Sequence, residues 1–426
     1  MTNVKLKILS VNTSDSSGGA ARAAYRIHCG VRQLGVNSQM FVKNKQLDDE
    51  TVLSLSLFVP KNVFCRLYQY VQHKIKNKIQ QARWSKYPNR EDIFLSDLRS
   101  VSLHGALQKL DFDLLHLHWI NLRFFNLKEL VKIQKPIVWT LHDSWAFTGI
   151  CHYSYDCDKF KSQCGACPFL RSSDKHDLSH RVWKAKKKIY SKLNLHIVTP
   201  SAWLADLASE SSLLKRFPIT VIPNCLDTTV FKILDKADAL ATLGLSNDKK
   251  KILFGAVNAI SDARKGFKEV IEAIHYLEQN VDCSWFELLV FGAEKPIAEI
   301  ETRMQIHYLG YVDNEAELVK IYNVADVMVV PSLSEVFGQT ASESMACGTP
   351  VVAFNCTGIK EVVTHKVTGY LAQPFDPIDL ANGISWCLEN NNSSELSRNA
   401  RKKVEENFTM EKVSQQYIDL YKSLLK

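Results

Sequence analysis

The sequence predicts an α/β protein built from two doubly wound domains, each a parallel sheet covered by helices. Short apolar, β-branched runs alternate with helical patterns through both halves of the chain, and this alternation is typical of parallel sheets buried on both faces. The 426 residues exceed one ordinary core and suit two domains. With 46% hydrophobic and 23% charged residues, the chain also has an ordinary globular composition.

The patterns of the first half run from the N-terminus to about residue 222. The strand candidates are Leu6 to Val11, Ser38 to Val42, Leu114 to His118, Ile137 to Leu141, Leu195 to Val198 and Thr220 to Ile222. The helix candidates are Ala20 to Leu34, Phe64 to Trp84, Leu98 to Leu110 and His180 to Leu193. Short apolar runs suit buried strands, and longer runs with helical periodicity suit helices.

The second half repeats this plan after a break at Pro223 and Asn224. Its strand candidates are Lys251 to Val257, Phe286 to Phe291, Gln305 to Leu309, Asp326 to Val330 and Val351 to Phe354. Its helix candidates are Phe267 to Glu278, Glu315 to Val324, Gln339 to Met345 and Pro377 to Glu389. We therefore place the domains at residues 1–223 and 224–409, with a cleft between the facing carboxyl edges of their sheets. The last pattern, Met410 to Leu425, is a single helix within residues 410–426, which we expect to dock back onto the first domain.

The chain carries a net charge of +8, and the charge is uneven. The segment Lys61 to Arg90 contains many Lys and Arg but no acidic residue, and Arg181 to Lys192 is also basic. Such patches suit an anionic partner, namely membrane lipid, nucleic acid or a phosphorylated substrate. No apolar run approaches the roughly 20 residues of a membrane span, and the N-terminus is expected to be a first strand rather than a signal peptide. We expect a cytoplasmic protein, placed at the inner face of the membrane if the basic segment binds lipid.

The stretch PSLSEVFGQTASESMACGTP, from Pro331 to Pro350, places two carboxylates at one edge of the second sheet. Glu335 would lie in the loop after a buried strand, and Glu343 would lie about a turn and a half into the following helix. Ligands bind at this edge of open parallel sheets. Both glutamates could instead be solvated, but Glu335 has no other charged residue around it from Ser332 to Ser342.

A Gly-rich turn follows the first strand, in SDSSGGAARAAYRIH (Ser14 to His28). Gly18 and Gly19 allow a ligand to approach the backbone, and the helix N-terminus offers N–H groups to a phosphate. The pattern is neither GxGxxG nor a P-loop, so it supports neither dinucleotide nor ATP binding. The alternative is a glycine-capped tight turn without a ligand.

Histidines end two strands of the first domain. LLHLHWIN carries His116 and His118, and IVWTLHDSW carries His142 followed by Asp143. Active-site loops begin at such strand ends. His142 is the stronger candidate because it closes an otherwise apolar strand beside an acidic residue. A structural role is the alternative for all three histidines, and the more frequent one for His116 and His118.

Four of the 11 cysteines cluster after the second of these strands, with the spacing C-x5-C-x6-C-x2-C. They are Cys151, Cys157, Cys164 and Cys167. Four thiolates this close in sequence could bind a structural zinc tetrahedrally, with His152 as a further nitrogen ligand. The alternatives are free thiols in a reducing compartment or an oxidation-sensitive loop.

In the second domain, the cationic pair Arg264 and Lys265 precedes a glycine and a helix. Two cations at a helix start facing a cleft would form an anion site. The alternative is that both side chains are exposed to solvent.

These motifs together resemble retaining glycosyltransferases of family 4, whose GT-B fold has two Rossmann-like domains with an interdomain cleft. The strongest matches are Ser14 to Arg22, Ile137 to Cys167 and Ala325 to Ala353, and the last contains the E-x7-E signature of the family. The run HDSWAFTGICHYSYDC followed by CGACP is similar to a bacterial exopolysaccharide subgroup that includes colanic-acid-type transferases.

The resemblance implies catalytic roles for His142 and Glu335. In the family, the histidine at this strand end approaches the transferred sugar, and the first glutamate of the signature orients the sugar hydroxyls. The second glutamate, here Glu343, binds the nucleotide ribose. The loop with Gly18 and Gly19 approaches the donor sugar or diphosphate.

Further donor-binding residues are implied in the second domain. Lys265 matches a lysine that contacts the donor diphosphate, whereas the usual family arginine lies five or six residues earlier, where this chain has Ile260 and Ala259. Arg264 either replaces that arginine or faces solvent. The remaining implied donor-binding residues are Gly310, Tyr311 and Val312 over the nucleobase, and Phe337 and Gly338 beside Glu335.

The resemblance implies transfer of a hexosyl group from a UDP- or GDP-sugar to a glycan or polyprenyl-linked acceptor, with retention, in cell-surface polysaccharide biosynthesis. No cofactor or divalent metal is expected for catalysis, so the predicted zinc would be structural. The expected partners are the donor, the acceptor and a membrane surface contacted through residues 61–90, with no nucleic acid.

Two other classes of protein are weighed against this one. A non-catalytic protein could bind anionic surfaces through Phe64 to Trp84, where apolar residues have helical spacing, although core packing also explains that spacing. A phosphorylase or an epimerase could share the architecture. The phosphorylase is disfavoured because no pyridoxal lysine signature is evident, and the epimerase because the E-x7-E signature is present.

Overall fold

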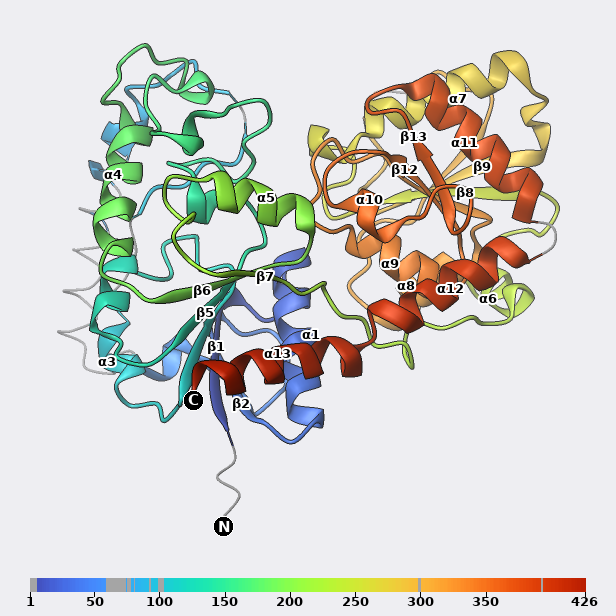
Figure 1. Cartoon of the computed structure of the whole chain (residues 1–426). Coiled ribbons are helices and arrows are strands. Elements are labelled where there is room, and N and C mark those ends of the chain that lie inside the picture. The colour runs from blue at the N-terminus through green and yellow to red at the C-terminus, as the bar shows by residue number, and fades with distance from the viewer. Residues whose placement is uncertain are drawn as a thin grey trace. The chain divides into compact units, whose positions relative to one another are not determined.

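The computed structural model describes residues 6–58, 74, 78–79, 81–91, 93–98, 103–297, 300–391 and 394–426. By its internal contacts the chain divides into two units (Figure 1). The first comprises Met1–Ile222 with Tyr417–Lys426, and the second comprises Pro223–Gln416. Each unit contains one parallel sheet, which confirms the predicted fold class.

The sheet of the first unit has seven strands in the order β3-β2-β1-β4-β5-β6-β7, and all neighbouring pairs are parallel. The order reverses between β1 and β4, and ligands of open α/β sheets bind at the carboxyl edge beside such a reversal. The strands are β1 Lys7–Ser14, β2 Asn37–Asn44, β3 Val52–Ser54, β4 Leu114–Leu117, β5 Ile137–Thr140, β6 Leu195–Thr199 and β7 Ile219–Val221. The α-helices are α1 Gly19–Gln33, α3 His104–Leu107, α4 Leu178–Tyr190 and α5 Ala202–Glu210.

The sheet of the second unit has six parallel strands in the order β10-β9-β8-β11-β12-β13. The strands are β8 Lys250–Gly255, β9 Phe286–Phe291, β10 Gln305–Tyr308, β11 Val327–Val330, β12 Val351–Phe354 and β13 Gly369–Ala372. The helices are α6 Lys236–Leu243, α7 Phe267–Asn280, α8 Glu315–Val324, α9 Gln339–Ala346, α10 Ile359–Val362, α11 Pro377–Asn390 and α12 Glu395–Asn407. The last helix, α13 Met410–Leu424, begins in the second unit and ends in the first.

Alternate residues of β11 pack into different cores on the two faces of this second sheet. Val327 and Val329 join the core formed with α7 and α11. Met328 and Val330 join the core formed with α8, α9 and α12. Because side chains alternate along a strand and both faces are covered, the strand is apolar throughout. Polar chemistry is therefore left to the strand ends.

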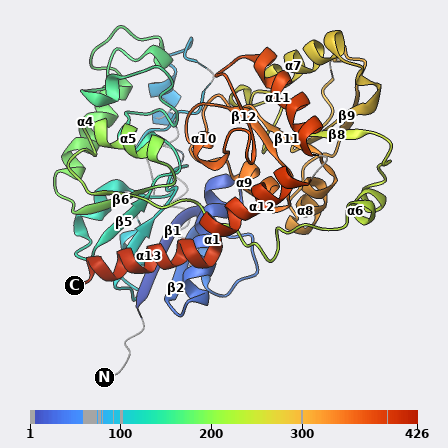
Figure 2. The ribbon, with the colours of Figure 1, turned by 45° about the vertical axis from the view of Figure 1, so that its right-hand side comes forward.

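The last helix, α13, ends against the sheet of the first unit (Figures 1 and 2). Tyr417 and Tyr421 are fully buried. The Tyr417 hydroxyl lies 3.1 Å from Thr140 Oγ1, and the Tyr421 hydroxyl lies 2.7 Å from Nδ1 of His116. These contacts join α13 to β5 and β4.

Several predicted elements differ from the structure. The helix predicted from Leu98 to Leu110 is helical only over His104–Leu107 within the described residues of that range. Strands β3 and β13 and helices α6, α10 and α12 were not predicted, because β3 has three residues, β13 starts at a glycine, and α12 is dominated by charged residues. Most of the predicted basic helix Phe64 to Trp84 lies outside the described residues.

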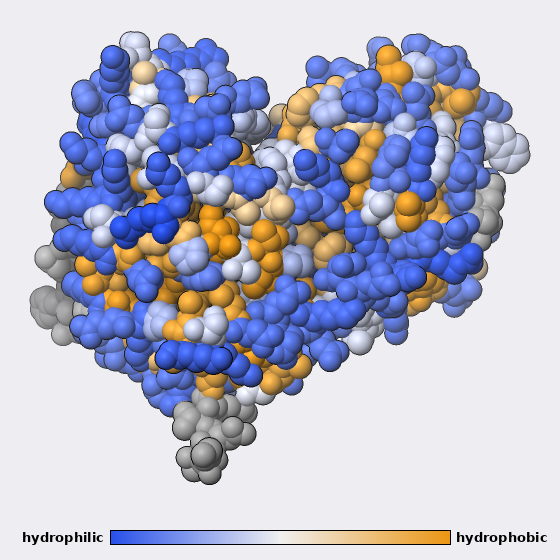
Figure 3. All heavy atoms as spheres, in the orientation of Figure 1, coloured by the Kyte–Doolittle hydropathy of each residue, from blue (hydrophilic) through white to orange (hydrophobic). Residues whose placement is uncertain are grey.

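Polar and charged side chains cover much of the face drawn in Figure 3, while apolar side chains gather over the middle of the first unit. Among the described residues, no helix combines the length and the apolar character that a membrane span requires.

The buried contact between α13 and β4 leads to a stability prediction. Tyr421→Phe should lower the free energy of unfolding of the first unit by about 1–3 kcal/mol, because Nδ1 of fully buried His116 loses its hydroxyl partner. Urea unfolding followed by Trp fluorescence measures this, since every Trp except Trp285 and Trp386 belongs to the first unit. Tyr311→Phe, at a 59% exposed position, is the control. An unchanged first-unit transition in Tyr421→Phe would contradict the prediction.

Candidate active site

Trp119 joins three strand ends at the carboxyl edge of the first sheet. Its backbone N–H donates to Asn12 Oδ1 (2.8 Å), at the end of β1. Its indole Nε1–H donates to Asp143 Oδ2 (2.7 Å), just after β5. Both acceptors are buried, and buried hydrogen bonds that are fully made hold their partners in one geometry. The loops after β1, β4 and β5 are therefore connected directly.

The loop between β1 and α1 carries Gly18 and Gly19 at this same edge. Gly18 has φ 86° and caps a 15-residue helix, and this left-handed conformation favours glycine. Asp15 accepts hydrogen bonds from the backbone N–H groups of Gln46 and Leu47 (3.0 and 2.9 Å), which tie the loop to the segment after β2. The structure thus places both predicted glycines at a helix N-terminus, where an anion is favoured.

His142 is partly exposed after β5, and its Nε2 lies 3.1 Å from Nδ1 of buried His118. Burial lowers the pKa of His142 to about 4, although the nearby charge of Asp143 opposes the shift. The ring is therefore neutral near pH 7 and can exchange hydrogen bonds with a ligand without carrying charge. A small hollow at these residues is lined also by Trp119, Asn121 and Trp145.

His116 and His118 lie inside the first unit rather than at its surface. Nε2 of His116 lies 2.8 Å from Thr140 Oγ1, and its Nδ1 contacts Tyr421. Burial lowers the pKa of His116 to about 3 and that of His118 well below its usual value. Both rings are internal, which agrees with a structural rather than a ligand-contacting role.

Asp143 connects the edge of the sheet to the cysteine-containing segment that follows. His152 Nδ1 lies 2.6 Å from Asp143 Oδ2, and the Trp145 N–H donates to Oδ1 (2.8 Å). Burial alone would raise the pKa of Asp143, but the charge of His152 and these hydrogen bonds outweigh it, so the pKa is lowered. His152 also reaches Ser96 Oγ (2.9 Å). The structure thus uses His152 as a partner of Asp143, not as a metal ligand.

The four clustered cysteines are free thiols, with Cys151, Cys164 and Cys167 buried and Cys157 partly exposed. Burial raises the pKa of Cys151, Cys164 and Cys167, that of Cys164 to about 12. Across the described residues, which include all four cysteines, no three His, Cys, Asp or Glu side chains are arranged to hold a metal ion. The four thiols, in the positions that the structure gives them, are not arranged as the ligands of one metal ion. The structural zinc is thus a prediction that rests on the spacing of the cysteines in the sequence.

A buried lysine, which the sequence patterns did not reveal, supports the loop after His142. Lys186 of α4 is fully buried, and its Nζ donates to the carbonyls of Thr148 (3.1 Å) and Gly149 (3.2 Å). The same Nζ donates to the carbonyl of Trp145 and lies 3.7 Å from the centre of its ring. Burial lowers the pKa of Lys186 to about 7. Its position four residues after the buried Val182, on the same helix face, is the signal that could have indicated burial.

In the second unit, Glu335 is the carboxylate on which the cationic pair converges. Lys265 Nζ lies 2.9 Å from Glu335 Oε2, and Arg264 NH1 lies 3.8 Å from the same oxygen. Burial raises the pKa of Glu335, but the charges of Lys265 and Arg264 outweigh it, so the pKa is lowered. Arg264 also bonds Asp262 (2.7 Å) and the Ser334 carbonyl (3.1 Å). It is therefore held within the unit rather than directed to solvent.

The loops after β8 and β11 approach closely at Gly266. Gly266 has φ 79°, and a Cβ there would lie 2.2 Å from the Pro331 carbonyl oxygen. The Leu333 N–H donates to the Arg264 carbonyl (2.9 Å). Only glycine permits this approach, and the approach brings Lys265 within reach of Glu335.

Glu343 lies inside the second unit, with 2% of its surface exposed. The hydroxyl of Tyr322, on α8, donates to Glu343 Oε2 (2.9 Å). The sequence motif predicted the position of Glu343 on α9 but not this partner, because Tyr322 has the apolar environment of an ordinary core residue.

The other predicted donor-binding residues lie at the same carboxyl edge. Gly310 follows β10, has φ 68° and accepts a hydrogen bond from the Gly292 N–H (2.7 Å). Tyr311 is 59% exposed, whereas Val312 is buried. These placements leave the backbone after β10 and the Tyr311 ring at the surface.

Phe337 and Gly338 connect the Glu335 loop to α9. Phe337 is buried and packs edge-to-face on Phe408, with ring centres 5.2 Å apart. Gly338 begins α9 with φ 96°, and a Cβ there would lie 3.1 Å from Ile359. Phe337 is thus a core residue that anchors the loop.

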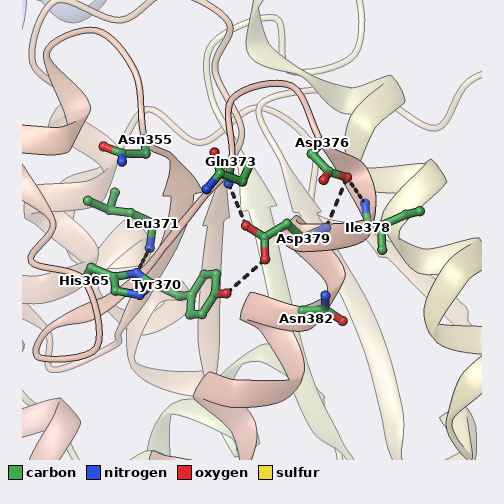
Figure 4. Close-up of a pocket in the computed structure, with 9 residues that line it drawn as sticks. All are labelled: Asn355, His365, Tyr370, Leu371, Gln373, Asp376, Ile378, Asp379 and Asn382. Atoms are coloured by element: carbon green, nitrogen blue, oxygen red, sulfur yellow. Dashed lines mark hydrogen bonds between the residues drawn. The ribbon is translucent and has the colours of Figure 1, made fainter.

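A second hollow of about 570 Å³ lies at the ends of β12 and β13 and the start of α11 (Figure 4). It is polar, and its two carboxylates are already engaged within the unit. Asp379 accepts hydrogen bonds from Tyr370 (2.9 Å) and from the Gln373 N–H (2.7 Å), and Asp376 caps α11. None of the predicted site residues lines this hollow.

The predicted site residues thus form two groups, each within one unit. Gly18, Gly19 and His142 lie at the edge of the first sheet. Arg264, Lys265 and Glu335 are in contact in the second unit. The facing of the two groups across a cleft stays a prediction.

Comparison with solved structures identifies the fold. The fold aligns with sucrose-phosphate synthase from Thermosynechococcus elongatus (TM-score 0.67, 19% identity, 99% of both chains). It also aligns with HepE of Anabaena, solved with UDP and glucose (TM-score 0.62, 18% identity, 98% of this chain and 100% of the other). The fold is that of GT-B glycosyltransferases.

Sequence comparison identifies the family. The family model described as Glycosyltransferase Family 4 matches residues 17–230, and the one described as Glycosyl transferases group 1 matches residues 242–406. The chain belongs to Glycosyltransferase Family 4. It is 25% identical over 436 residues to a putative colanic acid biosynthesis glycosyl transferase of Escherichia coli K12, covering 98% of this chain and 100% of that one. It is 26% identical over 332 residues to an uncharacterized glycosyltransferase of Methanocaldococcus jannaschii, covering 72% and 82%.

The network around Asp143 leads to a pH prediction. Asp143→Asn should lower the free energy of unfolding by about 1–3 kcal/mol at pH 7, because the charge-assisted contact with His152 is lost. Since the folded-state pKa of Asp143 is lowered, the carboxylate stabilises the fold above about pH 4, its unfolded-state pKa, and this contribution disappears as the pH falls through the folded-state value.

Urea unfolding at pH 7 and at about pH 3 tests this difference. The difference in the free energy of unfolding between wild type and Asp143→Asn should be smaller at about pH 3 than at pH 7. Asp156→Asn, at an exposed position of the same segment, is the matched control and should show no such difference at either pH. An equally large loss of unfolding free energy for Asp143→Asn at both pH values would contradict a stabilising role of the ionised Asp143 carboxylate.

Proposed function

We propose that this protein transfers a hexosyl group from a UDP- or GDP-sugar to a glycan or polyprenyl-linked acceptor, with retention, in cell-surface polysaccharide biosynthesis. The observation that carries the proposal is the convergence of Lys265 and Arg264 on Glu335 at the carboxyl edge of the second sheet. The solved complexes of a similar fold with UDP and UDP-glucose support a nucleotide-sugar donor. The relative named for colanic acid biosynthesis supports a polysaccharide product.

The proposed reaction exchanges one bond of the sugar anomeric carbon for another on the same face. The bond to the donor diphosphate oxygen breaks, and a bond to the acceptor hydroxyl oxygen forms. The acceptor proton passes to the leaving phosphate. Negative charge grows on the diphosphate, and a preorganised cation such as Lys265 stabilises it. Because this cation can carry the charge, the proposal requires no metal for catalysis.

Glu335, His142 and Glu343 would hold the rest of the donor. Glu335 orients the sugar hydroxyls, and its contact with Lys265 fixes the carboxylate relative to the diphosphate cation. The neutral His142 ring contacts the transferred sugar. Glu343, held by Tyr322, binds the ribose.

Arg264 has a different role from Lys265 in this proposal. Its guanidinium is bonded to Asp262 and to the Ser334 carbonyl, next to Glu335 in the chain. We assign it to holding the Glu335 loop, with the diphosphate contacted mainly by Lys265. The chain thus differs from the family pattern in the position of its arginine and in what that arginine holds.

The first unit, which we assign to the acceptor side of the transfer, is proposed to contact a membrane surface through the basic residues 61–90. Helix α4 of the same unit adds exposed cations at Arg181, Lys184 and Lys188, and basic side chains attract anionic lipid. A non-catalytic, surface-binding role for the whole chain is less favoured, because both halves match glycosyltransferase families.

A donor panel tests the proposal directly. Thermal unfolding and sugar-nucleotide hydrolysis are measured with a series of UDP- and GDP-sugars, with and without EDTA. Donors of one nucleotide class should raise the melting temperature, because a ligand that binds only the folded state stabilises it, and EDTA should leave turnover unchanged. A flat response to every donor would overturn the proposal in favour of the binding-only role.

Substitutions at the cation–carboxylate cluster make a second prediction. Lys265→Ala should lower kcat of transfer by about 100-fold or more, because it removes the cation beside the leaving group, and Glu335→Ala should also lower transfer severely. Lys268→Ala is the control, since that side chain is 82% exposed one turn further on. Near-normal transfer in both Lys265→Ala and Glu335→Ala would contradict the roles proposed for these two residues in transfer.

A further inference from the structure

His118 is a buried histidine that contacts the candidate site residue His142. Its Nδ1 lies 3.1 Å from Nε2 of His142, and its side chain is almost fully buried, with 2% exposed. Its Nε2 has no hydrogen-bond partner among the described residues. A buried polar atom without a partner is costly and calls for a reason.

We propose that His118 is a positioning residue whose Nδ1–H donates a hydrogen bond to Nε2 of His142. This bond fixes His142 as the Nδ1–H tautomer, which can donate a hydrogen bond to the sugar of the nucleotide-sugar. The role toward the sugar rests on the proposed function, whereas the tautomer does not. None of the residues given a role in the proposed reaction sets the tautomer of His142.

The direction of the hydrogen bond follows from the unpaired nitrogen. Each neutral imidazole carries one N–H. If His142 donated instead, His118 would bear its proton on Nε2, as a buried N–H without an acceptor. If His118 donates, Nε2 is a bare acceptor. Orphaned buried N–H groups are rarer than under-satisfied acceptors, so His118 is the donor. His142 must then carry its proton on Nδ1.

The rings are neutral and held in place, which the tautomer argument requires. Burial lowers the pKa of both His118 and His142 far enough to keep them uncharged near pH 7. The His116 ring packs on the His118 ring, with centres 4.0 Å apart. His116 cannot compete for the bond, because Thr140 and Tyr421 occupy its two nitrogens. The plane of His118 is thus set by packing against a ring that α13 anchors.

Nitrogen NMR of the full chain with ¹⁵N-labelled histidine tests the tautomer. At pH 7, the His142 signals, assigned by their loss in His142→Asn, should show a protonated Nδ1 and an unprotonated Nε2. In His118→Phe, which keeps a ring but no donor, this preference should disappear. In His118→Asn, whose amide N–H can replace Nδ1–H, it should persist. His196→Asn alters another histidine of the same sheet, paired with Thr220, and should leave His142 unchanged.

Transfer kinetics form the second arm. His118→Phe should lower kcat by up to about 100-fold with little change in the KM of the donor, because a misplaced group costs rate more than binding, and His118→Asn should restore most of it. An Nε2–H tautomer of His142 in the wild type, or one unaffected by His118→Phe, would overturn the inference. If His118→Phe does not fold, the wild-type tautomer and His118→Asn still decide. Failure of transfer with every donor would reject the proposed function and leave the NMR result standing.

Discussion

Burial of both faces of each parallel sheet is the constraint on which the rest of this structure depends. Alternate residues of β11 enter separate cores, so the strand interior has no place for an unpaired polar group. A charge that is buried away from the carboxyl edge has to be paired. Lys251 and Glu287, at the start of β8 and β9, form such a pair at 2.8 Å. Chemistry that must meet a ligand is confined to the carboxyl ends of the strands and their loops.

Those ends are held in different ways in the two units. In the first, hydrogen bonds through Trp119 connect the ends of β1, β4 and β5, and Lys186 supports the loop beyond them. In the second, the close approach at Gly266 brings two loops together, and ion pairs with Glu335 complete the contact. Both arrangements fix side chains before a ligand arrives, which is what positioning for group transfer requires.

The sequence predicted what depends on local pattern. Most strands were placed within one or two residues because buried strands are continuous apolar runs, and Lys265 and Glu335 were selected by motif. It did not predict what depends on which elements pack together. The contact of Tyr322 with Glu343 depends on the packing of α8 against α9. The burial of Lys186 depends on which face of its helix is covered, and the role of His118 depends on its contact with His142. The contact of Arg264 with Asp262 and the Ser334 carbonyl likewise depends on two loops meeting.

The two units also offer different electrostatics. Burial lowers the pKa of His142, so near pH 7 the carboxyl edge of the first sheet presents a neutral ring, and the same edge carries the N-terminus of α1. The nearby carboxylate of Asp143 is already engaged by His152 and Trp119. The second unit presents Lys265 and Arg264 around Glu335, and Arg264 is also paired with Asp262. A diphosphate needs cations, whereas a sugar, being uncharged, needs directional hydrogen bonds. The proposed function assigns the diphosphate to the cations of the second unit, and a fixed His142 tautomer would give the edge of the first unit a directional hydrogen bond.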